Sequence, residues 1–288
     1  MTEVLTLPGR GDGPEAARAA EVLEGGGLVL LPDLPFDVRP GERDLIDPAV
    51  LGGGSKNISL DPRTGALSGS ALEGDRLEAL AAMTRRYAEF ADGLISRLAP
   101  GYAPHLKRKR TSFRPGAVAT RALSPRKDDR RLHVDAFPAS PVGSDRILRV
   151  FSNVDPLGRD RVWEVGEQGF EAFARDFAPR VRDGGGALRS LLALTGVTRG
   201  QRTAYDQAML DLHDRAKLDE AWQAAAPRRR IAFPAGSSWI VYTDGVLHAA
   251  LEGQHAFEQT YLMPLEAMEA PARSPQRTLE RVLGRPLI

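Results

Sequence analysis

The chain has 288 residues, 42% of them hydrophobic, and this composition excludes a wholly disordered protein. Because it contains no cysteine, it cannot form disulfides or thiolate metal sites, so a bound metal would need His and carboxylate ligands. The net charge of +1 gives by itself no reason to expect a polyanionic partner. We expect a single domain over residues 1–288.

The N-terminal part of the chain, 1–104, predicts a helical and β elaboration packed on the core. A short helix is expected over 14–24, where Pro14 suits the first turn, and a buried strand follows at 27–34. A longer helix is predicted over 76–98 by apolar residues at helical spacing. No signal peptide or membrane span is recognisable, so we expect a cytoplasmic protein.

The remaining elements predict a mainly β core over 105–270 with flanking helices. Strand candidates rich in β-branched and aromatic residues occur at 146–154, 161–165, 230–234, 237–244 and 256–264. A helical insertion is expected near 167–222, with helices near 168–176, 187–194 and 203–222, and the C-terminal segment 271–288 predicts a helix over 275–284. Helices and strands do not alternate strictly, which favours an antiparallel sandwich or barrel over a doubly wound parallel sheet.

A His-x-Asp pair, His133 and Asp135, is the most informative local feature. If the backbone there is extended, both side chains point to one face of a sheet. His248, which follows a strong strand and an Asp-Gly turn, could supply a third ligand. Two His and one carboxylate leave other coordination positions open, an arrangement suited to ferrous iron that holds a co-substrate and dioxygen. A surface His beside a loop carboxylate is the simpler alternative.

The order and spacing of these residues resemble the iron(II)/2-oxoglutarate dioxygenases with a double-stranded β-helix (jelly-roll, cupin-like) core. Longer runs are similar to the Kdo hydroxylase family, among them TSFRP (111–115), RKDDRRLHVDAFPASP (126–141) and FPAGSSWIVYTDGVLHAALEGQ (233–254). Members of that family hydroxylate carbon 3 of 3-deoxy-D-manno-oct-2-ulosonic acid (Kdo) in the lipopolysaccharide inner core. The resemblance implies Fe(II), 2-oxoglutarate and dioxygen as cofactors, and His133, Asp135 and His248 as catalytic iron ligands.

The residue that anchors the distal carboxylate of 2-oxoglutarate departs from the common pattern. Many dioxygenases of this class place an Arg about ten residues after the distal His, but no Arg or Lys follows His248 there. Some members use a basic residue on the strand after the His-x-Asp pair, so we expect Arg149 first and Arg146 second. Neutral hydrogen bonds could come from Asn153, Gln259 and Thr260. Alternatively, each arginine pairs with an acidic neighbour on the sheet.

Segment 105–131 is strongly basic, with ten Lys and Arg residues against two Asp. Such a run is usually a solvated face or a flexible loop, but here it precedes the predicted iron ligands and could attract an acidic substrate. The substrate contacts that we expect from it are Lys107, Arg108, Arg114, Arg126 and Lys127. Since its only aromatic residue is Phe113, we do not expect a nucleic-acid partner.

The resemblance implies an acidic glycolipid substrate, Kdo-lipid A, which would require peripheral contact with the inner membrane surface. Two alternatives stay open: a dioxygenase of the same fold that acts on another acidic substrate, and a non-catalytic jelly-roll binding protein. His213, on a predicted helix beside Asp214, is expected to be a helix-surface or half-buried residue rather than a substrate contact. The sequence indicates no oligomeric state.

Overall fold

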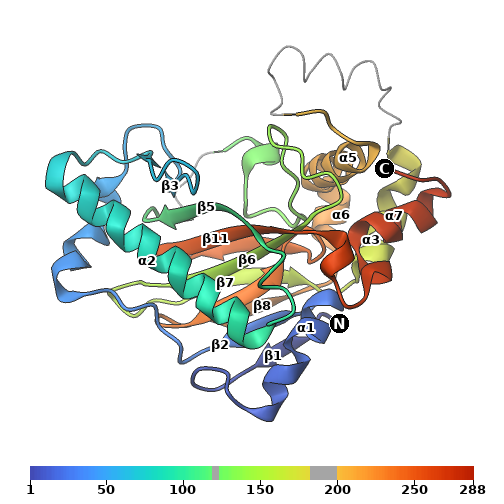
Figure 1. Ribbon diagram of the computed structural model, residues 1–288. Coiled ribbons are helices and arrows are strands. Elements are labelled where there is room, and N and C mark those ends of the chain that lie inside the picture. Colours follow the sequence, from blue (N-terminus) through green and yellow to red (C-terminus); the bar gives the residue numbers. More distant parts are fainter. Residues whose placement is uncertain (119–122, 182–199) are drawn as a thin grey trace.

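The computed structural model describes residues 1–118, 123–181 and 200–288, and its strands form two sheets (Figure 1). The larger sheet has eight strands in the order β1-β2-β9-β6-β11-β5-β3-β4, and the smaller has three in the order β10-β7-β8. In the described part of the chain, β1 and β2 pair in parallel and the other strand pairs are antiparallel. The predicted antiparallel architecture is confirmed.

The strands are β1 (Val4–Thr6), β2 (Leu28–Leu31), β3 (Ile58–Leu60), β4 (Leu67–Ser68), β5 (Lys107–Arg114), β6 (Arg146–Asn153), β7 (Arg161–Gly166), β8 (Arg228–Phe233), β9 (Ser238–Tyr242), β10 (His248–Glu252) and β11 (Ala256–Met263). The α-helices are α1 (Ala19–Glu24), α2 (Gly74–Leu98), α3 (Phe170–Phe177), α5 (Ala204–Leu218), α6 (Glu220–Ala225) and α7 (Pro275–Leu283). The helix expected at 187–194 lies outside the described residues.

Two features of the larger sheet differ from the sequence-based expectation. The first hundred residues contribute β1 to β4, so they extend the sheet itself. The basic run Lys107–Arg114 forms strand β5, although its charged first half gives no apolar alternation. Its second half is largely buried, because β5 lies between β11 and β3. Neighbouring strands therefore decide its conformation.

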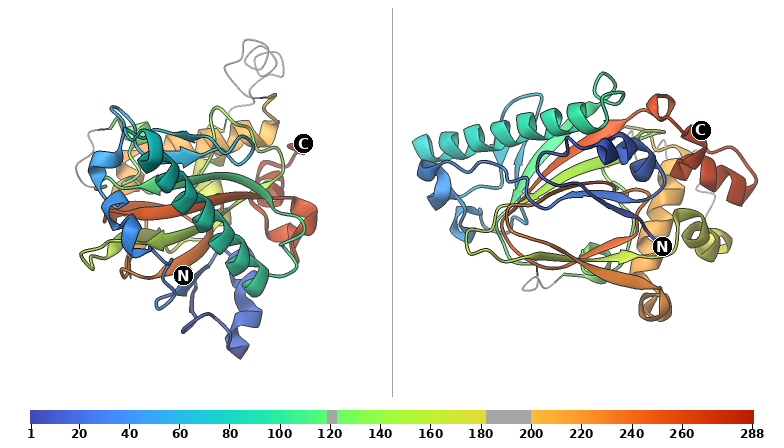
Figure 2. Two further views of the ribbon diagram at one scale, coloured as in Figure 1. Left: turned by 60° about the vertical axis from the view of Figure 1, so that its left-hand side comes forward. Right: turned by 90° about the horizontal axis from the view of Figure 1, so that it is seen from below.

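The interior between the two sheets is aromatic. Trp239 stacks on Phe233 and on Phe151, with ring centroids 4.0 and 5.2 Å apart, and Trp163 packs edge-on against all three rings. Seen from below, the strands enclose this interior as a flattened ring, with α1 and α2 on the outside (Figure 2). Burial of these rings supplies hydrophobic stabilisation to both sheets at once.

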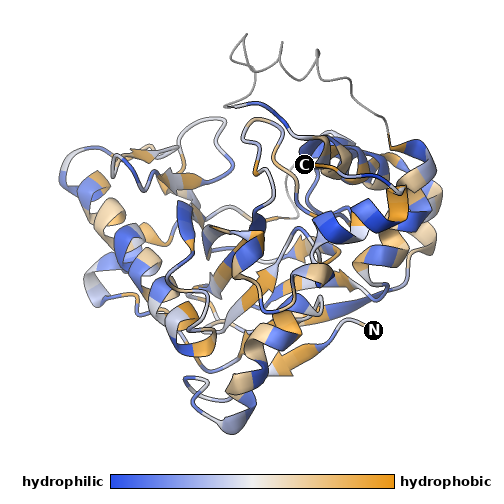
Figure 3. Cartoon of the chain, turned by 45° about the vertical axis from the view of Figure 1, so that its right-hand side comes forward, coloured by the Kyte–Doolittle hydropathy of each residue, from blue (hydrophilic) through white to orange (hydrophobic). Residues whose placement is uncertain are grey.

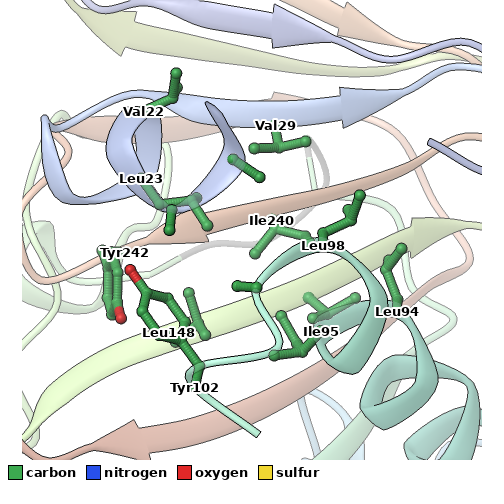
Figure 4. Close-up of a cluster of buried hydrophobic side chains, with 14 of the residues drawn as sticks. Val22, Leu23, Val29, Leu94, Ile95, Leu98, Tyr102, Leu148, Ile240 and Tyr242 are labelled. Carbon is green, nitrogen blue, oxygen red and sulfur yellow. The ribbon is translucent and has the colours of Figure 1, made fainter. Parts of the chain in front are cut away.

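A second core lies on the outer face of the larger sheet. Leu148 of β6 and Ile240 of β9 pack there against Leu94 and Ile95 of α2 and Leu23 of α1 (Figure 4). Along β6, Phe151 belongs to the interior cluster and Leu148 to this outer one, as expected for a strand with both faces buried.

The remaining helices, α3, α5, α6 and α7, gather at one end of the sandwich. They enclose a third cluster that includes Leu132 and Val134, which flank His133. The flanking helices carry both hydrophilic and hydrophobic residues, as expected for helices with one buried face (Figure 3). Among the described residues, none of the helices combines the length and the apolar character needed to cross a bilayer.

Candidate metal centre

His133 and His248 meet across a short antiparallel bridge. Each donates its backbone N–H to the carbonyl of the other, at 3.1 and 2.9 Å, and the N–H of Asp135 donates to the carbonyl of Thr243 at 2.8 Å. Val134 is buried in the hydrophobic cluster that α3, α5, α6 and α7 enclose. Because side chains alternate along an extended backbone, its neighbours His133 and Asp135 face the opposite side. The extended backbone that the sequence analysis assumed is therefore present at the His-x-Asp pair.

The three side chains form a potential metal site. One ligand atom from each of His133, Asp135 and His248 lies within 4.8 Å of the other two. The Nδ1 atoms of the histidines lie 2.7 Å from the carbonyl of Arg131 and 2.9 Å from that of Val246, so each Nδ1–H donates to the backbone. Both Nε2 lone pairs are then available for a metal, and two nitrogens with one carboxylate oxygen suit ferrous iron.

The protonation states also suit a metal. Burial lowers the pKa of His133, and the neighbouring His248 and Lys217 lower it further. Burial likewise lowers the pKa of His248. For Asp135, burial raises the pKa, but Arg149, the two histidines and Thr243 together outweigh it, so the net shift is downward. At neutral pH the site therefore offers neutral imidazoles and an ionised carboxylate, the forms that bind metal.

The three residues line a cavity of about 310 Å³, a size within the range of small-molecule sites. Its walls come from both sheets, from α5 and from the N-terminal segment. The cationic residues that line it are Lys56, Arg114, Arg126, Lys127, Arg149, Arg161 and Lys217, and the anionic ones are Asp129, Asp135 and Glu258. The cavity is therefore suited to anionic ligands.

Buried carboxylates hold two of the lining arginines. Arg149 places Nη2 3.1 Å from Asp135 Oδ2 and Nη1 3.0 Å from Glu258 Oε1. The other carboxylate oxygen of Glu258 accepts from Arg114, at 2.7 Å from Nη2. Burial raises the pKa of Glu258, but Arg114 and Arg149 outweigh this and lower it. Glu258 thus orients both guanidinium groups.

Neither Glu258 nor Arg161 was among the site residues expected from the sequence. Arg161 is 4% exposed and lines the cavity together with Trp163, two residues later on β7. A signal for Arg161 existed in this alternation, because side chains two apart on a strand share a face. Glu258 likewise lies two residues before Thr260, which was an expected contact, so both side chains share one face of β11.

Arg146, the second anchor expected for 2-oxoglutarate, does not line the cavity. It lies three residues from Arg149 on β6 and therefore faces the opposite side of the sheet. Its Nε lies 2.7 Å from Asp244 Oδ2, and its guanidinium lies 4.1 Å from the ring centroid of Tyr242. The pairing with an acidic neighbour, which the sequence analysis left open, is what the structure shows for this residue.

The three expected neutral contacts also lie outside the cavity lining. Asn153 donates from Nδ2 to two backbone carbonyls, at 2.9 and 3.0 Å. Gln259 accepts from the Thr111 hydroxyl at 2.6 Å. Thr260 donates to Glu258 at 3.3 Å and so contacts a cavity residue. Their hydrogen bonds support the strands and turns around the site.

The basic segment divides into two groups. Arg114, Arg126 and Lys127, three of the expected substrate contacts, line the cavity. Lys107 instead pairs with Asp145 at 2.8 Å, and Arg108 pairs with Asp92. Neither of these two residues belongs to the cavity lining. Arg121 of the same segment lies outside the described residues.

Two further walls were not anticipated. Lys56 and Asn57 reach the cavity from the N-terminal segment, and no local pattern in the sequence marks them. His213 and Lys217 reach it from α5. His213 lies near Asp214 as expected, with Nδ1 3.0 Å from its carboxylate, but it also packs edge-on against His133 at 5.4 Å. His213 and Lys217 are four residues apart on a predicted helix, and this spacing was the sequence signal that both share one side of it.

Comparison with known proteins identifies the family. The family model described as 3-deoxy-D-manno-oct-2-ulosonic acid (Kdo) hydroxylase matches residues 12–286. The solved structure of the Kdo hydroxylase KdoO with α-ketoglutarate and Fe(III) is 40% identical, with a TM-score of 0.94 over 100% of this chain and 98% of that one. Its cobalt(II) complex is 41% identical, with a TM-score of 0.95 over 99% and 97%. A comparison with curated proteins found no match.

A further KdoO structure contains succinate and Fe(III) and is 40% identical, with a TM-score of 0.94 over 99% of this chain and 97% of that one. The predicted mainly β jelly-roll core with flanking helices is confirmed by these matches. The resemblance noted in the sequence is confirmed as well. The chain belongs to the Kdo hydroxylase family of non-haem iron(II)/2-oxoglutarate-dependent dioxygenases.

Proposed function

We propose that this protein hydroxylates carbon 3 of Kdo in Kdo-lipid A, with Fe(II), 2-oxoglutarate and dioxygen. The observation that carries the proposal is the His133, Asp135 and His248 cluster in a cation-lined cavity, in a chain 40% identical to KdoO over its full length. When bound, iron supplies the oxidising chemistry that couples conversion of 2-oxoglutarate to succinate and carbon dioxide with insertion of one oxygen atom into a C–H bond.

The protein's own groups hold and orient the reactants. The carbonyls of Arg131 and Val246 keep the two imidazoles in the metal-binding tautomer. Trp163 stacks against His248, with ring centroids 5.3 Å apart, and restricts the rotation of that ligand. Such positioning keeps the reacting carbon and the metal in a productive geometry.

Arg149 is our proposed anchor for 2-oxoglutarate, because its guanidinium lies in the cavity beside the ligand Asp135. Arg161 is the second candidate, since it is buried and lines the same cavity. A guanidinium can bind a carboxylate through two parallel hydrogen bonds. Either arginine could bind the distal carboxylate of the co-substrate in this way.

We propose that the lipid-linked acceptor approaches the metal site over the rim of the cavity, which Arg126 and Lys127 form. Arg126 lines the cavity with 63% of its side chain exposed, and Lys127 lies beside it. Exposed cations attract the phosphates and carboxylates of an acidic glycolipid, and they also favour an anionic membrane surface. We therefore place the reaction at the cytoplasmic face of the inner membrane, reached by peripheral contact.

We also propose that all 288 residues form one catalytic domain. Strands β1 to β4 belong to the same sheet as β6 and β11, and Lys56 lines the cavity. Separation of the N-terminal part from the rest would therefore expose sheet edges and remove part of the cavity wall.

The test is oxygen transfer to Kdo-lipid A. With Fe(II), 2-oxoglutarate and dioxygen, the acceptor should gain the mass of one oxygen atom while an equivalent of succinate appears. His133→Ala should lose both products, whereas His105→Ala, which removes a histidine outside the cavity lining, should retain them. Succinate formed only with a different acidic acceptor would indicate another substrate, and a protein that binds neither iron nor 2-oxoglutarate would be a binding module.

A further inference from the structure

Helix α5 forms one wall of the cavity through His213 and Lys217. Residues four apart lie on the same side of a helix, so both face the metal ligand His133. Lys217 is only 1% exposed although it ends in an ammonium group. The arginines Arg149 and Arg161 belong to strands β6 and β7, so Lys217 stands on a different wall from the proposed 2-oxoglutarate anchors.

The ammonium of Lys217 has an incomplete set of partners. In the described part of the chain the ammonium forms no hydrogen bond with a protein group, and it pairs with the carboxylate oxygen Asp129 Oδ1 at 3.9 Å. Direct charge-assisted hydrogen bonds are about 2.7–2.9 Å long. Asp129 is also shared with Lys56, at 3.5 Å, and Arg114, at 3.9 Å. One carboxylate thus faces three cations, each at 3.5 Å or more.

A buried cation without an acceptor is unfavourable unless a ligand supplies one. Besides Asp129, the charged groups that face Lys217 are Asp135 and Asp128, which favour its charge, and Lys56, which opposes it. Asp135 belongs to the metal cluster, so iron would take much of its charge. The charge balance at the wall formed by α5 therefore favours one more anionic group, close to the metal ligands.

We propose that Lys217 binds the carboxylate of the acidic sugar and thereby positions its deoxy carbon for hydroxylation. This assignment rests on the proposed function. In a 3-deoxy-2-ulosonic acid, the carboxyl carbon and the methylene carbon 3 are both bonded to carbon 2. A cation beside the metal ligands that holds the carboxylate therefore brings carbon 3 close to the metal.

Burial gives this contact its selectivity. Exposed rim cations bind phosphates and carboxylates alike, and solvent screens them. A buried ammonium instead penalises an acceptor that lacks the acid, because the cation would stay unpaired in the occupied cavity. Lys217 would then distinguish a sugar acid from a neutral sugar, while the rim cations raise the local concentration of acidic lipids.

The experiment compares wild type and Lys217→Met on Kdo-lipid A with its sugar carboxylate free or methyl-esterified. Esterification should lower kcat/KM of the wild type about tenfold or more but that of Lys217→Met by less than about twofold. With the free acid, Lys217→Met should lose about tenfold in kcat/KM, mainly through KM. Anaerobic binding of 2-oxoglutarate to the Fe(II) protein, followed by visible absorption, should not change.

Arg215→Met is the matched control, because it removes a charge from the same helix at a residue outside the cavity lining. It should keep the full ester penalty. Lys217→Arg should restore part of the penalty, and Lys217→Gln serves if the Met variant does not fold. An equal penalty in wild type and Lys217→Met would overturn the assignment while leaving the proposed function intact. Absence of oxygen transfer to any Kdo acceptor by the wild type would overturn both.

Discussion

Arg146 and Arg149 show how a separation of three residues decides the role of a side chain. Successive side chains of a strand alternate between faces, so the two arginines of β6 reach different surroundings. Arg149 lies in the cavity between Asp135 and Glu258, while Arg146 is paired with Asp244 on the other face. Residue type alone makes both arginines candidate anchors for 2-oxoglutarate. The face of the strand to which each side chain points distinguishes them.

Arg149→Gln should raise the KM for 2-oxoglutarate about tenfold or more, because it removes a charge-assisted contact to a carboxylate. Succinate release at varied 2-oxoglutarate concentrations measures this value. If instead the KM is unaffected in Arg149→Gln but rises in Arg161→Gln, the anchor is Arg161.

Arg146→Gln should act on stability. It leaves Asp244 buried without its cation, which costs about 3–5 kcal/mol of unfolding free energy. Urea unfolding measures the loss, and the KM for 2-oxoglutarate should stay within about twofold of wild type if the residue has no part in co-substrate binding. The double variant Arg146→Met, Asp244→Leu should recover most of the lost stability, since no buried charge is left unpaired.

Helix α5 is tied at its first turn to the loop that follows the His-x-Asp pair. Asp206 accepts from the Thr203 N–H and hydroxyl at 2.9 and 2.8 Å, which completes a capping box. Its other oxygen accepts from the backbone N–H groups of Val142 and Gly143, at 2.8 and 3.2 Å. One carboxylate therefore fixes the start of the helix and its distance from the loop that follows Asp135.

Asp206→Ala should lower the unfolding free energy by about 2 kcal/mol, since it removes a cap and leaves half-buried backbone donors unpaired. Because α5 carries Lys217, the KM for the acceptor should rise as well. Asp219→Ala is the control: Asp219 caps α6 by accepting from the Trp222 N–H and does not line the cavity. It should cost about 1 kcal/mol and leave the KM unchanged.

At the scale of the molecule, the cavity joins elements that are remote in sequence. The metal cluster draws His248 from β10 of the smaller sheet, and Arg149 comes from β6 of the larger one. Lys217 belongs to the helical end, and Lys56 to the N-terminal segment. Ligands that occupy the cavity contact all these parts in the folded state alone, so their binding should stabilise the whole fold.

Co(II) together with 2-oxoglutarate, at about 100 times their dissociation constants, should raise the Tm by roughly 5–10 °C. Differential scanning calorimetry measures the shift without turnover. His133→Ala should show little shift, because it removes one of the three proposed metal ligands. His105→Ala should shift like the wild type. An undiminished shift in His133→Ala would contradict the ligand assignment.

Local sequence was sufficient for the fold class, the main strands and the candidate metal ligands. The β-branched and aromatic residues of β6 and the helical spacing in α2 are local properties, as is the single-residue spacing of His133 and Asp135. The chemistry of His and carboxylate ligands then limits the metals that suit the site. The long motifs around both histidines were enough to indicate the family.

The tertiary structure decided which charges share the cavity. Strand β5 could not be predicted, because its charged first half has no apolar alternation and its conformation depends on β11 and β3. Arg161, Lys217 and Glu258 come together only when β7, α5 and β11 pack around one space. Whether a cation is exposed, paired or directed at a ligand depends on such long-range neighbours, and these are properties of the folded chain rather than of any local segment.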